Sequence, residues 1–447
     1  RYSNNVEGMV GMSHVQKILD FASAKHVLPD GVRADTARLL ADTLAVGAAG
    51  AASPQARVLL PVVQGWGASE DARLIGGGNL TAPAPSAAFF NGFAIHCLEW
   101  DAVHEQAVVH ALSVVTAALL AVSDRMGGSE PEAFLTALAV GVDIASGMGV
   151  AATGPMQFFR PATAGIIGAS LAAARLQGLS REQMADVLGL AYSHASGTMQ
   201  AHVEASFALP LQIANAARAA VSSVDLAAAG MDGPHDVLDG PFGYFKLFEP
   251  GDLARYTDSI GDKWLIEEVS IKPFPSGRAS HGILGAIDDM LRDGSLDAEA
   301  VQSVDIESPP LIHRLVGRAY KADMTSSYAR LCLPFLVPLM LRDRIIDPRC
   351  FTAEDFANPK LVALGKKVVV RIDDNPDHNA LAPQKLVLHL ADGGVIERAI
   401  NDNLGSPSAP TSPAQTQSKF DLARSLADDN CAPAIFDNPL AYATEPQ

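Results

Sequence analysis

The densest group of ionisable side chains lies in the segment NGFAIHCLEWDAVHEQAVVH, residues 91–110. Six of them fall within an otherwise apolar stretch: His96, Glu99, Asp101, His104, Glu105 and His110. Imidazole gains and loses a proton near neutral pH, so histidines beside carboxylates suit general acid–base chemistry. His110 begins a strongly apolar run and must either cap a helix or face a cleft. We expect His110 to transfer a proton, with Asp101 or His104 orienting it.

The same segment raises the alternative of a metal site. His96 and Glu99 are three residues apart, so one helical face can present both to a cation. However, no HxxxH or HExxH pattern occurs here, and Trp100 and Ala102 interrupt the polar face. The sequence therefore predicts acid–base groups in this segment and no metal ligands.

A second cluster, IKPFPSGRASH at residues 271–281, predicts an anion-binding site. Two prolines stiffen the chain before a Ser-Gly turn, and an amphipathic helix follows from about Arg278 or Ala279. Free N–H groups at a helix start favour a bound anion. Lys272, Arg278 and His281 lie close to that point, and Ser276 can donate a hydrogen bond. The alternative is an ordinary strand, turn and helix with solvated charges.

Three further features of the sequence bear on a possible site. Arg160 follows two phenylalanines, so it can clamp a substrate carboxylate or pair with a buried acid. Tyr320 is a candidate proton donor, although a surface role is also open. The glycines at 76–78 lack the Lys-Ser/Thr and the GxGxxG pattern of nucleotide-binding loops. We expect a plain turn there and no nucleotide cofactor.

Composition restricts the class of protein. Hydrophobic residues make up 48% of the 447 residues, and the formal net charge is −17. An acidic surface repels nucleic acid and anionic membranes, so we expect neither as a partner. The four cysteines have no CxxC spacing. We expect them to be free thiols and the protein to reside in the reducing cytoplasm. No signal peptide is visible, and Met12 is a possible start.

The pattern along the chain predicts a mostly α protein, with a large all-helical domain and an inserted smaller α+β domain. Apolar residues at i, i+3, i+4 and i+7 mark helices such as HVQKILDFASA and ADTARLLADTLAVGAAG. The 16-residue run at 107–122 reads as a core helix because it is too short for a membrane span. We assign residues 12–265 and 401–447 to the helical domain, and 266–400 to the α+β domain.

The α+β domain is expected to hold strands at EEVSIKPFP, VQSVDIESP and KVVVRID, followed by a hairpin around Asp392-Gly393-Gly394. One helix should follow Ser280 and another should run from Ser326 to Arg342. The Pro/Ser-rich link at 403–416 should have no regular structure. A last helix, SKFDLARSLADD, should return the chain to the helical domain.

With these residues in hand, the chain resembles the MmgE/PrpD family. Four passages carry the likeness: APSAAFFNGFAIHCLEWDAVH, GIIGASLAAARLQGLSREQ, ANAARAAVSSVDLAAAGMDGPHDVLDGPFG and IKPFPSGRASH. The resemblance implies a helical domain built from both termini, an inserted α+β lid, a site between them, a homodimer and no cofactor. It also implies a small polycarboxylate as substrate.

The departures from the family pattern bear on the reaction. The acidic pair of the family appears as Asp101-Ala102, Arg160 replaces a histidine before a Pro-Thr step, and Leu209 and Gln212 replace a lysine and a histidine. The overall pattern looks most like the iminodisuccinate epimerases of the family. A dehydratase, lyase or decarboxylase acting on a citrate- or aconitate-like tricarboxylate is the alternative, and a non-catalytic carboxylate-binding protein is a third.

For an epimerase, the resemblance implies cations on the substrate carboxylates and two proton-transfer groups on opposite faces of one carbon. Lys272 and Arg278 would hold the carboxylate next to that carbon, and Arg160 a distal one. His110 would be one proton-transfer group. The other would be Lys272, His281 or Tyr320.

Overall fold

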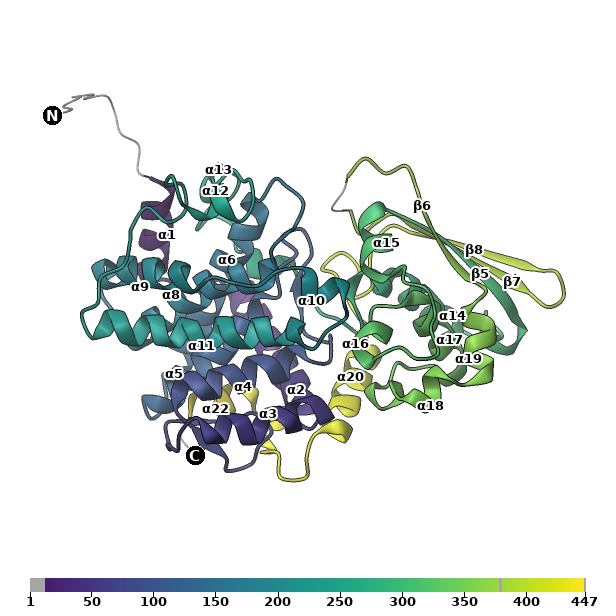
Figure 1. Cartoon of the computed structure of the whole chain (residues 1–447), viewed down its shortest axis with the longest axis horizontal. Coiled ribbons are helices and arrows are strands. Elements are labelled where there is room, and N and C mark those ends of the chain that lie inside the picture. The colour runs from purple at the N-terminus through teal and green to yellow at the C-terminus, as the bar shows by residue number, and fades with distance from the viewer. Residues whose placement is uncertain (1–12, 378–379, 446–447) are drawn as a thin grey trace.

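Two hydrophobic cores organise the chain, and the computed structural model describes residues 13–377 and 380–445 (Figure 1). The first core takes its residues from Val15 to Ile271 and again from Leu422 to Ala443. The second runs from Phe274 to Ile400. The smaller part is therefore inserted into the larger one, and the fold is mostly α as the sequence predicts. The possible start at Met12 lies outside the described residues.

Long helices form the first core. They are α1 (His14–Ser23), α2 (Asp30–Ala51), α3 (Pro54–Gly65), α4 (Ala84–His96), α5 (Ala111–Arg125), α6 (Pro131–Ala151), α8 (Gly165–Gln177), α9 (Arg181–His194), α11 (Ala208–Ala228) and α20 (Pro413–Leu426). Shorter ones are α7 (Arg160–Thr163), α10 (Gln200–Val203), α12 (Tyr244–Leu247), α13 (Ala254–Thr257), α21 (Ala434–Asp437) and α22 (Pro439–Thr444). Two-residue strands β1 (Ala72–Arg73) and β2 (Thr81–Ala82) flank the glycine turn. Two of its glycines adopt positive φ, which fits the predicted plain turn.

Small residues let these helices approach closely. A Cβ on Gly168 of α8 would lie 2.1 Å from the carbonyl oxygen of Gly141 in α6. A Cβ on Gly50 of α2 would lie 1.8 Å from the carbonyl oxygen of Ala94 in α4. No real side chain tolerates such distances, so glycine is required at both crossings. The second crossing fixes the end of α4, from which the candidate site begins.

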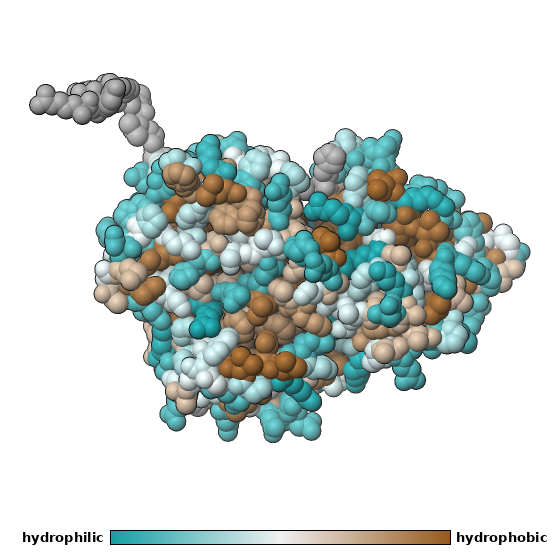
Figure 2. Space-filling view, in the orientation of Figure 1, coloured by the Kyte–Doolittle hydropathy of each residue, from teal (hydrophilic) through white to brown (hydrophobic). Residues whose placement is uncertain are grey.

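Helix α6 is long and apolar enough to cross a membrane by length and composition, yet 89% of its most apolar window is buried inside the protein. Over α3, by contrast, Figure 2 shows an apolar patch on the surface, to which Val58, Val62 and Trp66 contribute. Patches of this kind are typical of surfaces that contact another chain. The homodimer stays a prediction.

The second core packs helices against a four-stranded sheet of order β6-β5-β7-β8. Its strands are β5 (Val301–Ser308), β6 (Val368–Ile372), β7 (Gln384–Leu390) and β8 (Val395–Ile400). Strands β5 and β6 are parallel and the other pairs antiparallel, with Asp305 opposite Val369 on one side and Val387 on the other. The predicted hairpin around Asp392-Gly393-Gly394 is confirmed as the β7–β8 turn.

Helices α14 (His281–Arg292) and α17 (Leu333–Asp343) pack against this sheet, and α15 (Pro310–Val316), α16 (Ser326–Ala329), α18 (Ala353–Phe356) and α19 (Pro359–Gly365) complete the domain. The helix predicted after Ser280 is confirmed as α14. The single helix predicted from Ser326 to Arg342 is wrong. The chain breaks it after Ala329, and α17 restarts with Pro334 in its first turn, where a missing N–H costs nothing.

Two other expectations need correction. The strand predicted at EEVSIKPFP shortens to β4 (Val269–Ser270), which pairs with β3 (Val103–His104). The proline after Lys272 prevents a longer ladder because proline has no N–H to donate. The link predicted at 403–416 is irregular only as far as Ser412, whose side chain caps α20 at Pro413. Helix α20 then packs on α2, as expected for a return to the helical domain.

Candidate active site

A cavity with about 690 Å³ of space, including its open mouth, lies at the junction of the two domains. The helical domain lines it with His96, Glu99, His110 and His202, and the segment after β4 adds Lys272 and Arg278. Most other lining residues are apolar, among them Val103, Met156, Phe159, Leu311 and Leu315. The β3–β4 pair brings the two polar groups together, because it joins the strand before His110 to the strand before Lys272.

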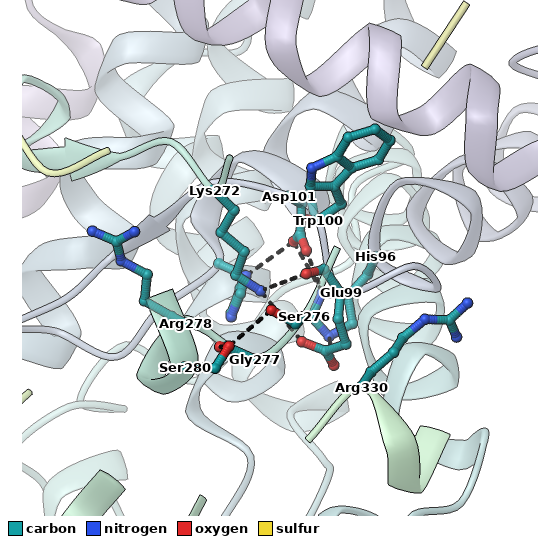
Figure 3. A network of polar contacts seen from close by, with 12 residues as sticks. His96, Glu99, Trp100, Asp101, Lys272, Ser276, Gly277, Arg278, Ser280 and Arg330 are labelled. Carbon is teal, nitrogen blue, oxygen red and sulfur yellow. Dashed lines mark hydrogen bonds and ion pairs between the residues drawn. The ribbon is translucent and has the colours of Figure 1, made fainter. Parts of the chain in front are cut away.

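Asp101 is the centre of the polar network drawn in Figure 3. Its fully buried carboxylate accepts hydrogen bonds from Nδ1 of His96 at 2.9 Å, from Nδ1 of His110 at 3.0 Å and from the hydroxyl of Ser113. Burial opposes ionisation, but the two imidazoles outweigh it and hold the pKa of Asp101 well below its usual range. The carboxylate therefore fixes both rings by their Nδ1 atoms, with Nε2 of His96 3.6 Å from the Glu99 carboxylate and Nε2 of His110 left for the cavity.

The pKa values of the two imidazoles are shifted in opposite directions although their rings are 4.8 Å apart. Burial disfavours the charged form of His96, but Asp101 and Glu99 outweigh burial and raise its pKa. For His110 burial prevails, Lys272 adds to it, and the pKa is lowered despite Asp101. At neutral pH His110 is therefore a neutral imidazole whose Nε2 lone pair can accept a proton.

Lys272 is fully buried and supplies the positive charge beside His110. Its ammonium donates to the backbone carbonyl of Glu99 at 3.1 Å and to the Glu99 carboxylate at 3.3 Å. Burial opposes ionisation of Glu99, yet Lys272, His96 and His110 together lower its pKa to about 2. Figure 3 shows Lys272 reaching toward the loop of Glu99 and Asp101, so the ammonium is fixed at the cavity.

The backbone of the acid–base loop (residues 96–110) is strained where it lines the cavity. Glu99 has φ 55° and Val108 has φ 53°, values that residues other than glycine seldom adopt. Helix α4 ends at His96, pressed against Gly50 of α2, so the loop must turn sharply to place Asp101 under both histidines. Strain of this kind is typical of positions held for function.

The basic segment (residues 271–281) is only partly open to the cavity. Arg278 lines it, but its guanidinium donates to Glu105 at 2.6 Å and to the carbonyls of Leu404 and Asn403. His281 and Ser276 are fully buried outside the lining residues, and the ring Nε2 of His281 lies 3.2 Å from the Ser276 carbonyl. Most of the hydrogen-bond donors that the sequence predicted for anion binding are therefore already bonded to groups of the protein.

The structure places three other predicted residues away from the cavity. Arg160 is buried and paired with Glu249 at 2.7 Å. Of the two roles that the sequence left open for Arg160, this is the pairing with a buried acid. His104 lies 3.2 Å from Glu268 and faces a neighbouring cavity. Tyr320 donates its hydroxyl to the Phe356 carbonyl inside the α+β domain. The structure does not bring these three together with His110 and Lys272.

Sequence reasoning missed His202, which α10 presents to the cavity. Burial lowers its pKa to about 4, and Arg318 adds to the effect. Arg318 lies 3.3 Å from the His202 Nδ1 and donates to its carbonyl. A neutral His202 that accepts at Nδ1 carries its proton on Nε2 and can donate to a substrate oxygen. Helix α10 has only four residues, so no periodicity marked it.

Among the described residues, His96, Asp101 and His110 have ligand atoms within 4.8 Å of one another and so could hold a metal ion. Both rings direct Nδ1 to the Asp101 carboxylate at 2.9 to 3.0 Å, which is hydrogen-bond spacing. A metal shared by Asp101 and these two nitrogens would have to displace those hydrogen bonds. The donor set therefore fits a proton-transfer group better than a preformed metal site.

Comparison with known proteins identifies the family. Residues 18–257 match the MmgE/PrpD N-terminal domain and residues 274–430 match the MmgE/PrpD C-terminal domain. Similar proteins include the cis-aconitate decarboxylase of Mus musculus, 24% identical over 93% of this chain and 85% of the relative, and that of Homo sapiens, 25% identical over 90% and 86%. The cis-aconitate decarboxylase of Aspergillus terreus is 23% identical over 92% and 89%. The chain belongs to the MmgE/PrpD family.

Proposed function

From membership of the MmgE/PrpD family, we propose that the chain is a lyase that decarboxylates cis-aconitate or a closely related unsaturated tricarboxylate. Its similar relatives bear the name cis-aconitate decarboxylase, which supports the lyase alternative better than the epimerisation expected from the sequence. The observation that carries the proposal is the neutral His110, backed by the ionised Asp101 and placed beside the Lys272 ammonium in a mostly apolar cavity.

In the first step the tricarboxylate enters with one carboxylate near Lys272. The C–C bond to a second carboxylate breaks, CO₂ leaves, and the electron pair spreads over the double bond toward the carboxylate held by the ammonium. A fixed cation stabilises charge that develops in the transition state. The apolar lining helps because a carboxylate is poorly solvated there and loses its charge when CO₂ forms.

In the second step a proton must reach the far carbon of the allylic anion. His110 is neutral in the empty site, but a bound trianion adds negative charge and so raises its pKa. Asp101 stabilises the resulting imidazolium through Nδ1, and Nε2 then delivers the proton to carbon. Glu99 and His96 hold Lys272 and Asp101 in place, and His202 can donate to a remaining carboxylate.

Three assays on the purified chain distinguish the reactions. With cis-aconitate, NMR should show an unsaturated dicarboxylate and stoichiometric CO₂, with one deuterium incorporated in D₂O. A hydroxytricarboxylate tests dehydration through the ultraviolet absorbance of the alkene. Iminodisuccinate tests epimerisation through deuterium exchange without an alkene. The proposal fails if cis-aconitate releases no CO₂ while either other substrate reacts.

A further inference from the structure

Arg330, at the end of α16, differs from the other buried cations of the protein. Lys272, Arg278, Arg160 and Lys419 each pair with a carboxylate. Arg330 is only 3% exposed and forms no ion pair within 4.0 Å among the described residues, and Glu99 is the acid whose charge reaches it from farther away. Burial of a charge without a counter-ion costs several kcal/mol, so an anion from outside the chain would relieve it.

The donors of Arg330 are also largely unused. Its Nη1 donates to the Cys97 carbonyl at 3.3 Å, and its Nε has no acceptor. The guanidinium lies over the ring of Phe351 at 5.0 Å. Figure 3 shows it extended away from Glu99 and Asp101, although Arg330 also borders a smaller cavity that His96, Glu99 and His202 line.

Arg330 lines a second cavity of about 860 Å³, including its mouth, between the two domains. The residues around this cavity include Arg349 and four residues with hydroxyl side chains, Ser53, Ser326, Thr352 and Ser425. None of the lining residues is an Asp or a Glu. Of the two arginines that line this cavity, Arg349 pairs with Asp347, so Arg330 supplies the unbalanced charge. Its charge favours an anion.

The N-terminus of α3 opens onto the same cavity through Ser53, Pro54 and Gln55. The Ser53 side chain caps the Ala56 N–H, whereas the Gln55 N–H has no acceptor among the described residues. A helix of 12 residues adds the partial positive charge of its first turn. One domain thus offers a helix start, and the other offers a buried unpaired guanidinium.

We propose that this cavity is a binding site for a small oxyanion of the phosphate class, held between Arg330 and the start of α3. Because the two groups belong to different domains, the anion would bridge the junction and stabilise the arrangement that forms the catalytic cavity. The inference does not depend on the proposed reaction, since binding is measured without substrate.

The test is the effect of inorganic phosphate on the folded full-length chain. Against sodium chloride at equal ionic strength, phosphate at ten times its Kd should raise Tm by about 1–2 °C. Calorimetry should give one phosphate per chain. Arg330→Met should abolish both signals, and without phosphate it should be at least as stable as the wild type because the unpaired charge is gone.

Two variants serve as matched controls. Arg349→Gln removes a cation from the same cavity, but one already paired with Asp347 at 2.6 Å, and it should keep the phosphate response. Lys272→Met removes a cation from the catalytic cavity and should also keep it. The inference is overturned if the wild type shows no response, if Arg330→Met retains it, or if either control loses it as Arg330→Met does.

Discussion

The acid–base loop (residues 96–110) and the basic segment (residues 271–281) meet at one cavity but use their polar groups differently. In the loop, Asp101 holds two histidines by Nδ1, so the Nε2 atom of His110 faces the cavity and that of His96 lies 3.6 Å from the Glu99 carboxylate. In the segment, Arg278 is occupied by Glu105 and by two carbonyls, while His281 is buried behind it. Lys272 is the member of the segment placed for chemistry.

The difference teaches that charge and position in sequence do not tell a binding group from a structural one. Arg278 donates across the junction to Glu105 of the loop, so this ion pair joins the two regions. A polar group that has no hydrogen-bond partner within the folded protein is the better guide to chemistry. Four changes test this distinction, from the largest expected effect to the smallest.

His110→Ala should lower kcat/KM with cis-aconitate by about 10²- to 10⁴-fold, the range for a lost general acid or base. The matched control is His104→Gln, since His104 belongs to the same loop but pairs with Glu268 outside the cavity. Steady-state kinetics should show less than about tenfold loss for the control. Equal losses in both variants would remove the distinction between the two histidines.

Glu105→Gln should lower the free energy of unfolding by about 3 kcal/mol, because it leaves the buried Arg278 without its carboxylate. Chemical denaturation measures the loss. The double variant Glu105→Gln/Arg278→Met should recover part of it, since no unpaired charge then remains. If the single variant is as stable as the wild type, the Arg278–Glu105 ion pair does not stabilise the fold, and Arg278 is free to bind substrate.

The pH dependence of stability should report His281. Burial first, and then Arg278 and Lys272, hold its pKa well below 6.5. Below pH 6.5 the unfolded chain takes up a proton that the folded chain refuses, so stability falls by up to about 1.4 kcal/mol per pH unit. His281→Gln should reduce this slope between pH 6.5 and 5 in denaturation series. An unchanged slope would contradict the burial assigned to His281.

Ser276→Ala should have the smallest effect. Its hydroxyl lies 2.8 Å from the Ser280 hydroxyl and 3.2 Å from Nε2 of His281, and Ser276 does not line the cavity. The loss of these contacts should cost about 1 kcal/mol of stability, with kcat/KM changed by less than about threefold. A large rise in KM at unchanged stability would instead return Ser276 to the substrate-binding groups.

Local patterns predicted much of the fold. Helical periodicity marked α1 and α2, and alternation around Asp392 marked the β7–β8 hairpin. These features depend on neighbours in the chain. The break between α16 and α17 was missed because an apolar run with a proline reads equally well as one helix or two.

For the site, the sequence by itself determined the density of ionisable residues near His110 and the position of Lys272 after a proline-stiffened turn. It also determined the family, because motifs along most of the chain carry it. Tertiary structure alone decided which cations find a carboxylate. Glu249 for Arg160, Glu105 for Arg278 and the absence of a carboxylate beside Arg330 among the described residues depend on contacts between segments distant in sequence. Charge is a property of the residue, but its availability is a property of the packing around it.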